Sequence, residues 1–381
     1  MTSTKKTAAK EKNLAVPTQP IAGFRTMPSD FSISLDARGG TERLLANPGS
    51  ERIQPMRGFE DTYVDIIDYI VRITHRIWEE KDIGYIYDTY KHNSRVVDGF
   101  GLQYGRDKIV SDTVHTVNAF PNIRLFADDI IWAGDDVVGF HTSHRTVIKG
   151  TNTGNSRYGV ATGKQVELWC IANCVALENE IFEEWVLYDN ADLVRQLGFD
   201  LRELARKIGN QRADNQVPVP SFEPERLPGQ GKPAYRTYQA NQSFDVTDFL
   251  ETTYHNIFNR RMLKTITRSH APNVLVLSSN GRRFYGRSQY QAFLLSILAT
   301  FPNLAFQIDD LYWMGNDTDG YRTAMRWSIV GNHSGWSLYG EPTGRQVHLW
   351  GITQHEIRNG RIEQEWMLFN EFALMQQIFR D

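Results

Sequence analysis

The chain has 381 residues, of which 41% are hydrophobic and 23% are charged, and its formal net charge is −3. This length and composition are typical of a globular protein with two cores, and the even spread of basic residues argues against a nucleic-acid partner. No apolar run of 18 residues occurs, so the sequence predicts no membrane-spanning helix and no membrane partner.

Residues 1–57 form the first predicted segment, an arm of largely irregular structure, because they are rich in Ser, Thr and Gly and show little apolar periodicity. The first fifteen residues are basic and polar and lack the apolar centre of a secretory signal. We therefore expect a cytoplasmic protein.

After the arm, the apolar period changes from that of helices to that of strands. Helical spacing predicts a helix over 62–80 and another over 106–119, where the proline of Phe-Pro-Asn ends it. Strand-like runs then follow over 123–133, 137–149, 164–177 and 181–188. Helices followed by strands with tight turns indicate an α+β layer in which a curved sheet covers the helices.

Both cysteines of the chain lie on the third predicted strand. Cys170 and Cys174 are four residues apart, so they share one face of that strand but are too far apart along it for a disulfide. We expect reduced core thiols.

The second half of the chain repeats the first. The octets TGKQVELW (162–169) and TGRQVHLW (343–350) agree at six of eight positions. At the same offset of 181, 27 of the 66 positions in 120–185 are identical to those in 301–366. Identity over this length indicates a duplicated domain.

The duplication sets the expected domain boundaries. We predict domain 1 over 58–205, a Pro- and Gly-rich linker over 206–239, and domain 2 over 240–381. Upstream of the second helix the offset between the copies changes by one residue, which indicates a length difference in a loop.

Several strings carry a resemblance to a known family. FPNLAFQIDDLYWMGN, GNHSG, PTGRQVHLWGI and RNGRIEQEWMLFN of the second copy resemble SnoaL-like polyketide cyclases, within the nuclear transport factor two superfamily. FPNIRLFADDIIWAGDD, ATGKQVELWCI and EEWVLYDNADLVRQLG of the first copy are similar. The resemblance implies two tandem cone-shaped α+β domains, each a curved mixed or antiparallel sheet wrapped around about three helices. This superfamily hosts cyclases, isomerases, dehydratases, hydrolases and non-catalytic binders, so the fold alone does not give the function.

The resemblance also implies site residues near the last strand of each copy. In the family, an Asp after this strand is the general acid/base and a Trp lies beside it at the mouth of the cone. These roles match Asp189 and Trp185 in the first copy, whereas the second copy has Asn370, which cannot exchange a proton. Strand alternation places Trp185 and Asp189 on one face, and burial there would raise the pKa of Asp189. The alternative is that Asp189 caps the helix that follows it.

Two histidines on the second strand are further candidates. His141 and His144 lie three residues apart, so one is expected to point into the cone and the other to an interface or to water. The inward imidazole, or Tyr188, would stabilise or protonate an enolate oxygen. A hydrogen-bonded structural role is the alternative. Two ligands of one ion normally share a face, so we expect no metal site.

The octets contribute a second set of candidates. Glu167 and Trp169 share a strand face, as do His348 and Trp350 in the second copy. This face either lines the pocket, where Trp would stack on a flat substrate, or is the convex side of the sheet at which such domains pair. We favour the interface for Glu167 and His348. The candidate substrate-binding residues are Trp185, Trp169, Glu167, Trp366, Trp350 and Asn370.

Together these features favour a cofactor-independent lyase, isomerase or cyclase that moves a proton beside a carbonyl group of a small organic molecule, with its active site in domain 1. The alternatives are a non-catalytic binding or assembly protein and a hydrolase of an epoxide or lactone. No cofactor is expected, because the sequence has no phosphate-cradling glycine loop. Domain 1 is expected to pack on domain 2 as a pseudo-dimer, which leaves a further homo-oligomer open. The Gly- and Asn-rich segment 150–159 is expected to form a lip over the pocket mouth.

Overall fold

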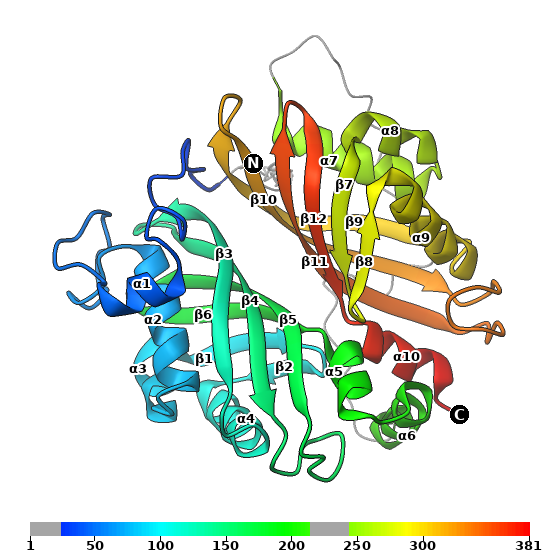
Figure 1. Ribbon diagram of the computed structural model, residues 1–381, viewed down its shortest axis with the longest axis horizontal. Helices are drawn as coiled ribbons and strands as arrows, with labels where there is room; N and C mark the ends of the chain where they lie inside the picture. Colours follow the sequence, from blue (N-terminus) through cyan, green and yellow to red (C-terminus); the bar gives the residue numbers. More distant parts are fainter. Residues whose placement is uncertain (1–23, 214–243) are drawn as a thin grey trace, which may run out of the picture.

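The computed structural model describes residues 24–213 and 244–381, which fold around two six-stranded sheets. Figure 1 shows the sheets next to each other, with most helices of each on the side that faces away from the other sheet. We call the part built on the first sheet domain 1 and the part built on the second domain 2. Residues 1–23 of the predicted arm and 214–239 of the predicted linker lie outside the described residues.

The two predicted helices and four predicted strands of domain 1 occur in the expected order, but two further strands lie between those helices and two further helices follow the last strand. Its helices are α1 (Thr41–Ala46), α2 (Ile66–Trp78), α3 (Ile86–Thr89), α4 (Arg106–Ala119), α5 (Asn190–Leu197) and α6 (Leu201–Ala213). Its strands are β1 (Tyr90–Asp98), β2 (Gly101–Tyr104), β3 (Arg124–Asp135), β4 (Gly139–Thr151), β5 (Gln165–Leu177) and β6 (Glu180–Tyr188).

Domain 2 repeats these elements in the same order, except that α1 and α6 have no counterpart among its described residues. Its helices are α7 (Val246–Tyr254), which a π-helical turn over His255–Asn259 extends, α8 (Ile266–Ser269), α9 (Gly286–Thr300) and α10 (Glu371–Phe379). Its strands are β7 (His270–Ser278), β8 (Arg282–Tyr285), β9 (Ala305–Asn316), β10 (Gly320–Asn332), β11 (Gln346–Arg358) and β12 (Arg361–Phe369).

Each sheet is open, and it is mixed, which is one of the two arrangements predicted for this α+β fold. The strand order is β2-β1-β6-β5-β4-β3 in domain 1 and β8-β7-β12-β11-β10-β9 in domain 2. The pairs β1–β6 and β7–β12 are parallel, and the other pairs are antiparallel. Strands β1 and β2 have no clear signal in the sequence, because exposed residues at the start of β1 and the short length of β2 give a weak alternation.

Local signals account for several element ends. Helix α2 begins later than predicted because Asp65 caps it, its side chain accepting a hydrogen bond from the Asp68 N–H at 2.7 Å. Helix α4 ends at Ala119, as predicted, and its C-cap Phe120 directly precedes a proline. Helix α6 continues eight residues past the predicted end of domain 1, to Ala213.

The inner face of each sheet packs on its helices, and the outer faces contact each other. Cys170 and Cys174 are buried on the inner face as free thiols, as expected. On the outer faces an apolar cluster joins the domains, and Trp185 and Trp350 meet edge to face with ring centroids 5.2 Å apart. Its buried members are Val97, Ile171, Trp185, Leu187, Leu277, Trp350, Ile352, Trp366 and Leu368.

Matched residues of the two copies make matched contacts across this interface. The Arg145 guanidinium lies over the Trp366 ring at 3.5 Å, and Arg326, its counterpart in domain 2, lies over the Trp185 ring at 4.1 Å. Each contact combines a cation with the face of an indole from the other domain. The duplication has therefore kept a near two-fold arrangement of these side chains.

The arm completes this interface at one point where the copies differ. Arg322 of domain 2 donates to Asp129 of domain 1 at 3.0 Å, whereas the counterpart of Arg322 in domain 1 is His141. Arg25 of the arm bridges that position, since its Nη1 lies 3.0 Å both from His141 Nδ1 and from Asp310 Oδ2. The described part of the arm is thus attached to both domains rather than loose.

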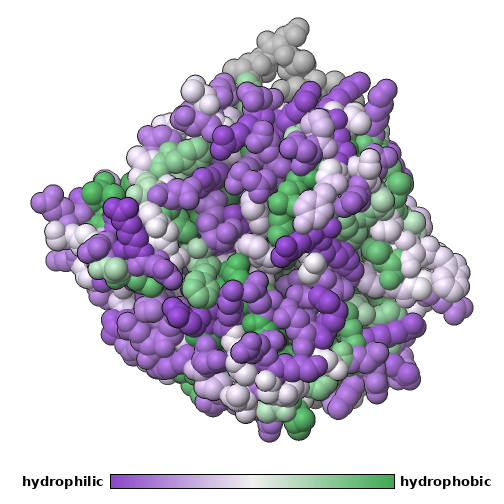
Figure 2. Space-filling model, viewed as in Figure 1, coloured by the Kyte–Doolittle hydropathy of each residue, from purple (hydrophilic) through white to green (hydrophobic). Residues whose placement is uncertain are grey.

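Among the described residues, no helix is long and apolar enough to cross a membrane. Figure 2 shows that the face in view is mainly hydrophilic, with apolar residues in small separate patches.

Candidate functional site

A cavity of about 680 Å³ lies between the inner face of the domain 1 sheet and its helices. A volume of this size suits a small organic ligand. Much of the wall is apolar, from residues such as Trp78, Ile109, Phe120, Leu168 and Leu193. The polar groups of the wall include Tyr90, Asp98, Asp112, His115, Arg157, Glu184, Tyr188 and Asn190.

Glu184 of β6 is the carboxyl group in this wall whose pKa is shifted most clearly. Burial raises the pKa of Glu184 to about 7, a hydrogen bond from the Tyr90 hydroxyl at 2.9 Å acts against that shift, and the charge of Asp98 adds to it. A carboxyl group with this pKa can both accept and donate a proton at neutral pH.

Asp98 ends β1 and supplies a second carboxyl group to the same cavity. Burial raises its pKa, while the Phe100 N–H and the Arg157 charge lower it. Its two oxygens accept hydrogen bonds from the Phe100 N–H and from Gln103 Nε2, each at 2.7 Å. These two donors fix the carboxyl group at the edge of the β1–β2 turn.

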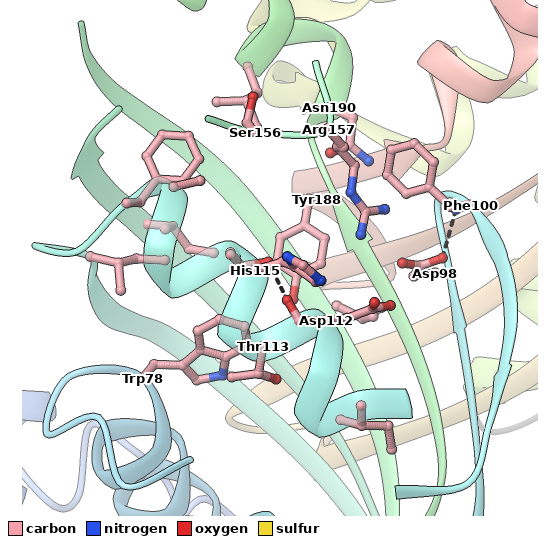
Figure 3. A pocket seen from close by; sticks show the side chains of 18 of the residues that line it. Trp78, Asp98, Phe100, Asp112, Thr113, His115, Ser156, Arg157, Tyr188 and Asn190 are labelled. Carbon is pink, nitrogen blue, oxygen red and sulfur yellow. Dashed lines mark hydrogen bonds between the residues drawn. The ribbon is translucent and has the colours of Figure 1, made fainter. Parts of the chain in front are cut away.

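The segment predicted to form a lip does line the rim of the cavity. Asn155, Ser156, Arg157 and Tyr158 all border it. The Tyr158 hydroxyl donates to Asn190 Oδ1 at 2.7 Å, which ties the segment to the start of α5. Figure 3 shows Arg157 reaching down from this segment towards Tyr188 and Asp98, with His115 of α4 across the cavity.

In domain 2 the corresponding space is filled by side chains. The space that remains between residues such as Phe258, Trp327 and Phe369 is about 20 Å³. Larger or more apolar residues occupy the matched positions. Trp327 stands where domain 1 has Thr146, Phe306 where it has Leu125, Phe293 where it has Asp112, Phe284 where it has Gln103 and Leu338 where it has Arg157.

The largest of these residues, Trp327, depends on a glycine opposite it. A Cβ atom on Gly351 would lie 2.2 Å from Trp327 Cζ2, so this position cannot carry a side chain while Trp327 is in place. Domain 1 has Cys170 at the matched position. The pairs Thr146 with Cys170 and Trp327 with Gly351 are therefore two alternative packings of one site, one leaving space and one filling it.

In domain 2 the residue that matches Glu184 is Glu365, and its carboxyl group is fully occupied by hydrogen-bonding partners from the protein. Glu365 accepts hydrogen bonds from the hydroxyls of Tyr254 at 2.9 Å and Tyr290 at 2.7 Å, and lies 3.3 Å from His270 Nε2. All four residues are almost completely buried. Burial acts to raise the pKa of Glu365, but the hydrogen bonds and nearby histidines outweigh it and leave the pKa lowered. Glu365 thus has partners from the protein instead of access to a ligand.

The predicted base, Asp189, lies outside the cavity. Its carboxylate accepts hydrogen bonds from the backbone N–H groups of Asn280 at 2.8 Å and Gly281 at 3.0 Å, both in domain 2. It also caps α5 through the Asp192 N–H at 3.3 Å. Burial raises the pKa of Asp189 to about 7, and the two N–H groups from domain 2 act against that rise. The inward direction predicted for Asp189 is wrong, and the helix-capping alternative describes its contacts.

Asn370 makes the matching contact in the opposite sense. Its Nδ2 donates to the Gly99 carbonyl of domain 1 at 2.9 Å, and its Oδ1 caps α10 through the Ala373 N–H at 3.2 Å. The turn after β7 is one residue longer than the turn after β1, so it presents N–H groups where the shorter turn presents a carbonyl. Asp189 is therefore an acceptor that faces two N–H donors of domain 2, whereas Asn370 is a donor that faces a carbonyl oxygen of domain 1.

The tryptophans proposed for the pocket lie at the domain interface. Trp185, Trp366 and Trp350 belong to the buried cluster between the sheets, and Trp169 packs against it. The predicted inward direction of Trp185 and Trp366 is wrong because the inner face of β6 carries the even-numbered residues Glu184, Val186 and Tyr188. A shift of one residue reverses every side chain of a strand.

Glu167 and His348 do not line either interior. Glu167 is exposed and pairs with Lys149 at 2.7 Å on the neighbouring strand. His348 is partly buried, and burial lowers its pKa. Neither residue is brought near the cavity carboxyl groups.

The two histidines of β4 do face opposite sides. His141 lies at the contact with Tyr312 of domain 2, their ring centroids 6.1 Å apart, and burial together with the Arg25 charge lowers its pKa to about 4. His144 is buried on the inner face, and burial lowers its pKa to about 4. It does not border the cavity, so among the predicted catalytic residues only Tyr188 does.

Sequence patterns contained a usable signal for one of the missed residues. Glu184 recurs as Glu365 at the offset of 181, inside the EW pair shared by both copies. An inward Trp185 implies that Glu184, the preceding residue of β6, points to the opposite face, so the strand alternation does not single out Glu184. Asp98 lies on the strand that was not predicted, so no pattern pointed to it. Among the described residues no group of His, Cys, Asp and Glu could hold a metal ion.

The raised pKa of Glu184 predicts a pH-dependent stability. The folded-state pKa of about 7 exceeds the usual 4.5, so the folded protein loses stability as pH rises from about 4.5 to above 7. Glu184→Gln removes this loss, and we expect the variant to be about 1–3 kcal/mol more stable than the wild type at pH 8 and similar at pH 4.5. Thermal unfolding at both pH values measures this. Glu167→Gln, on the surface, is the control, and an equal difference at both pH values would contradict the prediction.

Comparisons with known proteins agree with this fold. The model of the SnoaL-like polyketide cyclase family matches residues 68–197 and again 249–378. Among solved structures, IdmH from Streptomyces antibioticus is 21% identical, with 34% of this chain and 96% of that chain covered and a TM-score of 0.30. A SnoaL-like protein from Jannaschia sp. CCS1 is 17% identical, with coverages of 37% and 99% and a TM-score of 0.32. Comparison with curated proteins gives no match.

Proposed function

Because this chain belongs to the SnoaL-like polyketide cyclase family, we propose that domain 1 is a cofactor-independent cyclase, isomerase or lyase acting on a small carbonyl compound. One observation carries the proposal. The interior of domain 1 combines a ligand-sized cavity with a carboxyl group, Glu184, whose pKa is about 7, whereas the matched interior of domain 2 is filled. Perturbed carboxyl groups inside a concave apolar site are typical of acid/base catalysis.

In the proposed reaction, ionised Glu184 accepts a proton from the carbon next to the substrate carbonyl. The electron pair of the broken C–H bond moves to the carbonyl oxygen and forms an enolate. Tyr90 holds the Glu184 carboxyl group through its hydroxyl. Hydrogen-bond donors in the same wall, such as Tyr188, stabilise the enolate oxygen.

The enolate then leads to one of three products. Attack of its carbon on a second carbonyl of the same molecule closes a ring, return of the proton to another atom gives an isomer, and loss of a β-substituent gives an alkene. Glu184 returns its proton in each case, to the new alkoxide, to carbon or to the leaving group. Two hydrogen-bond donors hold the Asp98 carboxyl group in position, where it serves as a second acceptor, for a hydroxyl group of the substrate.

Domain 2 acts as the structural partner in this proposal. Its carboxyl group is sealed by Tyr254, Tyr290 and His270, and its interior has no space for a substrate. Its contribution is the interface that holds the outer face of β6 through contacts such as Arg326 on Trp185. That strand carries Glu184 on its other face.

Filling the cavity of domain 1 tests where the activity lies. Thr146→Trp combined with Cys170→Gly copies the packing of Trp327 and Gly351. We expect this variant to fold and to lose at least about 10-fold of the wild-type rate, because the substrate no longer fits beside Glu184. Deuterium uptake at carbon by 2-tetralone and anthrone in D₂O, followed by mass spectrometry, measures the rate.

Cys170→Gly alone is the matched control, since it leaves the cavity open, and its rate should stay near that of the wild type. An unchanged rate in the double variant would place the reaction outside the cavity. Binding of a probe by a wild-type protein that exchanges no proton would favour a binding protein without chemistry.

A further inference from the structure

The rim of the domain 1 cavity carries a cation that the mechanism above does not require. The side chain of Arg157 borders the cavity and remains exposed, and its guanidinium lies over the Phe100 ring at 4.1 Å. Among the described residues no carboxylate lies within ion-pair distance of Arg157, and the nearby carboxyl group on which its charge acts is that of Asp98. Its planar donor edge is therefore available to a ligand in the cavity.

Comparison with domain 2 indicates that this cation goes with the cavity. Arg157 corresponds to Leu338, and His115, on the opposite rim, corresponds to Ser296. The neighbouring residue Tyr158 corresponds to Tyr339, so the two copies share the tyrosine of this segment and differ at the arginine. The domain without a cavity thus lacks this arginine at the matched position, although the surrounding segment is alike.

The position of Arg157 relative to Glu184 defines a polar axis. Glu184 lies four residues before Tyr188 on the inner face of β6, a separation of roughly 13 Å along the strand. Arg157 enters from the rim at the Tyr188 end, as Figure 3 shows. Apolar side chains such as Trp78, Phe120 and Leu168 line the walls between. A ligand that fits is apolar in its body and charged at the end nearest Arg157.

The charged side chains at the rim of the cavity limit which anions can bind there. Asp98 and Asp112 also border the cavity, and Asp112 already pairs with Lys108. A doubly charged phosphate would meet these carboxylates with one guanidinium to balance it. A carboxylate carries one charge, and its two oxygens match the fork of a guanidinium.

From this arrangement we propose that the domain 1 cavity takes carboxylic acids with an apolar body, with Arg157 binding the carboxylate at the rim and the reacting carbonyl lying towards Glu184. The proposal rests on the proposed function for the direction of the carbonyl. It goes beyond that function by naming the ligand class and the residue that selects it.

Binding of a matched acid and ester tests the proposal. The probes are anthraquinone-2-carboxylate and its methyl ester, titrated calorimetrically into the full chain at pH 7.5. We expect the acid to bind at least about 10-fold more tightly than the ester, and Arg157→Leu, which copies Leu338, to remove that preference by weakening acid binding about 10- to 100-fold. Arg157→Lys should recover only part of the preference, because an ammonium lacks the planar fork.

The ester serves as the internal control for folding, since Arg157→Leu should bind it as the wild type does. Arg361→Leu removes an exposed arginine from the start of β12 and should change neither affinity. Equal binding of acid and ester by the wild type, absence of acid binding, or an acid preference that survives Arg157→Leu would overturn the proposal. Glu184→Gln separates it from the proposed function, because that variant should keep the acid preference even if no proton exchange is ever observed.

Discussion

Replacement of Glu184 by Gln is expected to lower the rate of deuterium uptake by the probe ketones by about 10²- to 10⁴-fold, the usual contribution of a general acid/base. Gln keeps the shape of the side chain and a hydrogen-bond acceptor for Tyr90 but cannot accept a proton. The wild-type rate should rise with pH through about 7, as Glu184 loses its proton. Rates for both proteins between pH 5 and 9 measure the effect.

Asp189→Asn is the matched control, because it removes the carboxyl group that the family resemblance assigns as the base. Asp189 is bound by the N–H groups of Asn280 and Gly281 and does not border the cavity. The rate per folded molecule should therefore stay within about 3-fold of the wild type, well below the effect of losing a catalytic base. Loss of exchange in Asp189→Asn with full exchange in Glu184→Gln would reverse our assignment.

The largest expected loss of stability comes from Asn370→Asp. The new carboxylate would face the Gly99 carbonyl, to which Asn370 Nδ2 now donates, in a position that is 5% exposed. Two acceptors would then meet without a proton between them, at a cost of about 2–4 kcal/mol. Chemical denaturation at pH 7.5 measures this change.

Acid should relieve that loss, because a protonated carboxyl group can donate to the Gly99 carbonyl again. The gap between Asn370→Asp and the wild type should therefore narrow at pH 5. Asn370→Ala separates charge from lost hydrogen bonding, and we expect a smaller cost of about 1–2 kcal/mol that does not depend on pH. Equal stability of Asn370→Asp and the wild type at pH 7.5 would show that this contact does not hold the domains.

These variants separate two roles that one region of sequence combines. The last strand of each copy ends in a residue that caps a helix and binds the turn of the other domain, Asp189 in one case and Asn370 in the other. The inner face of the same strand presents Glu184 or Glu365 to the interior. Divergence in one of these roles does not require divergence in the other.

The sequence alone determined the duplication, the family and the α+β architecture. Identity at 27 of 66 positions between 120–185 and 301–366 is independent of any assumption about side-chain direction. Helix ends at a proline and strand ends at turns depend on local chemistry, which the sequence displays directly. The buried, reduced state of Cys170 and Cys174 followed from the same local patterns.

Only the tertiary structure decided which face of each strand is the interior. Both faces of β6 are partly apolar, because one packs on the cavity and the other on domain 2, so alternation could not distinguish them. The family resemblance predicts an inward Trp185 and hence an outward Glu184, whereas Glu184 lines the cavity and Trp185 lies at the domain interface. The carboxyl groups Asp98 and Glu184 come from strands about 86 residues apart in sequence, and their shared cavity arises from the parallel pairing of β1 with β6.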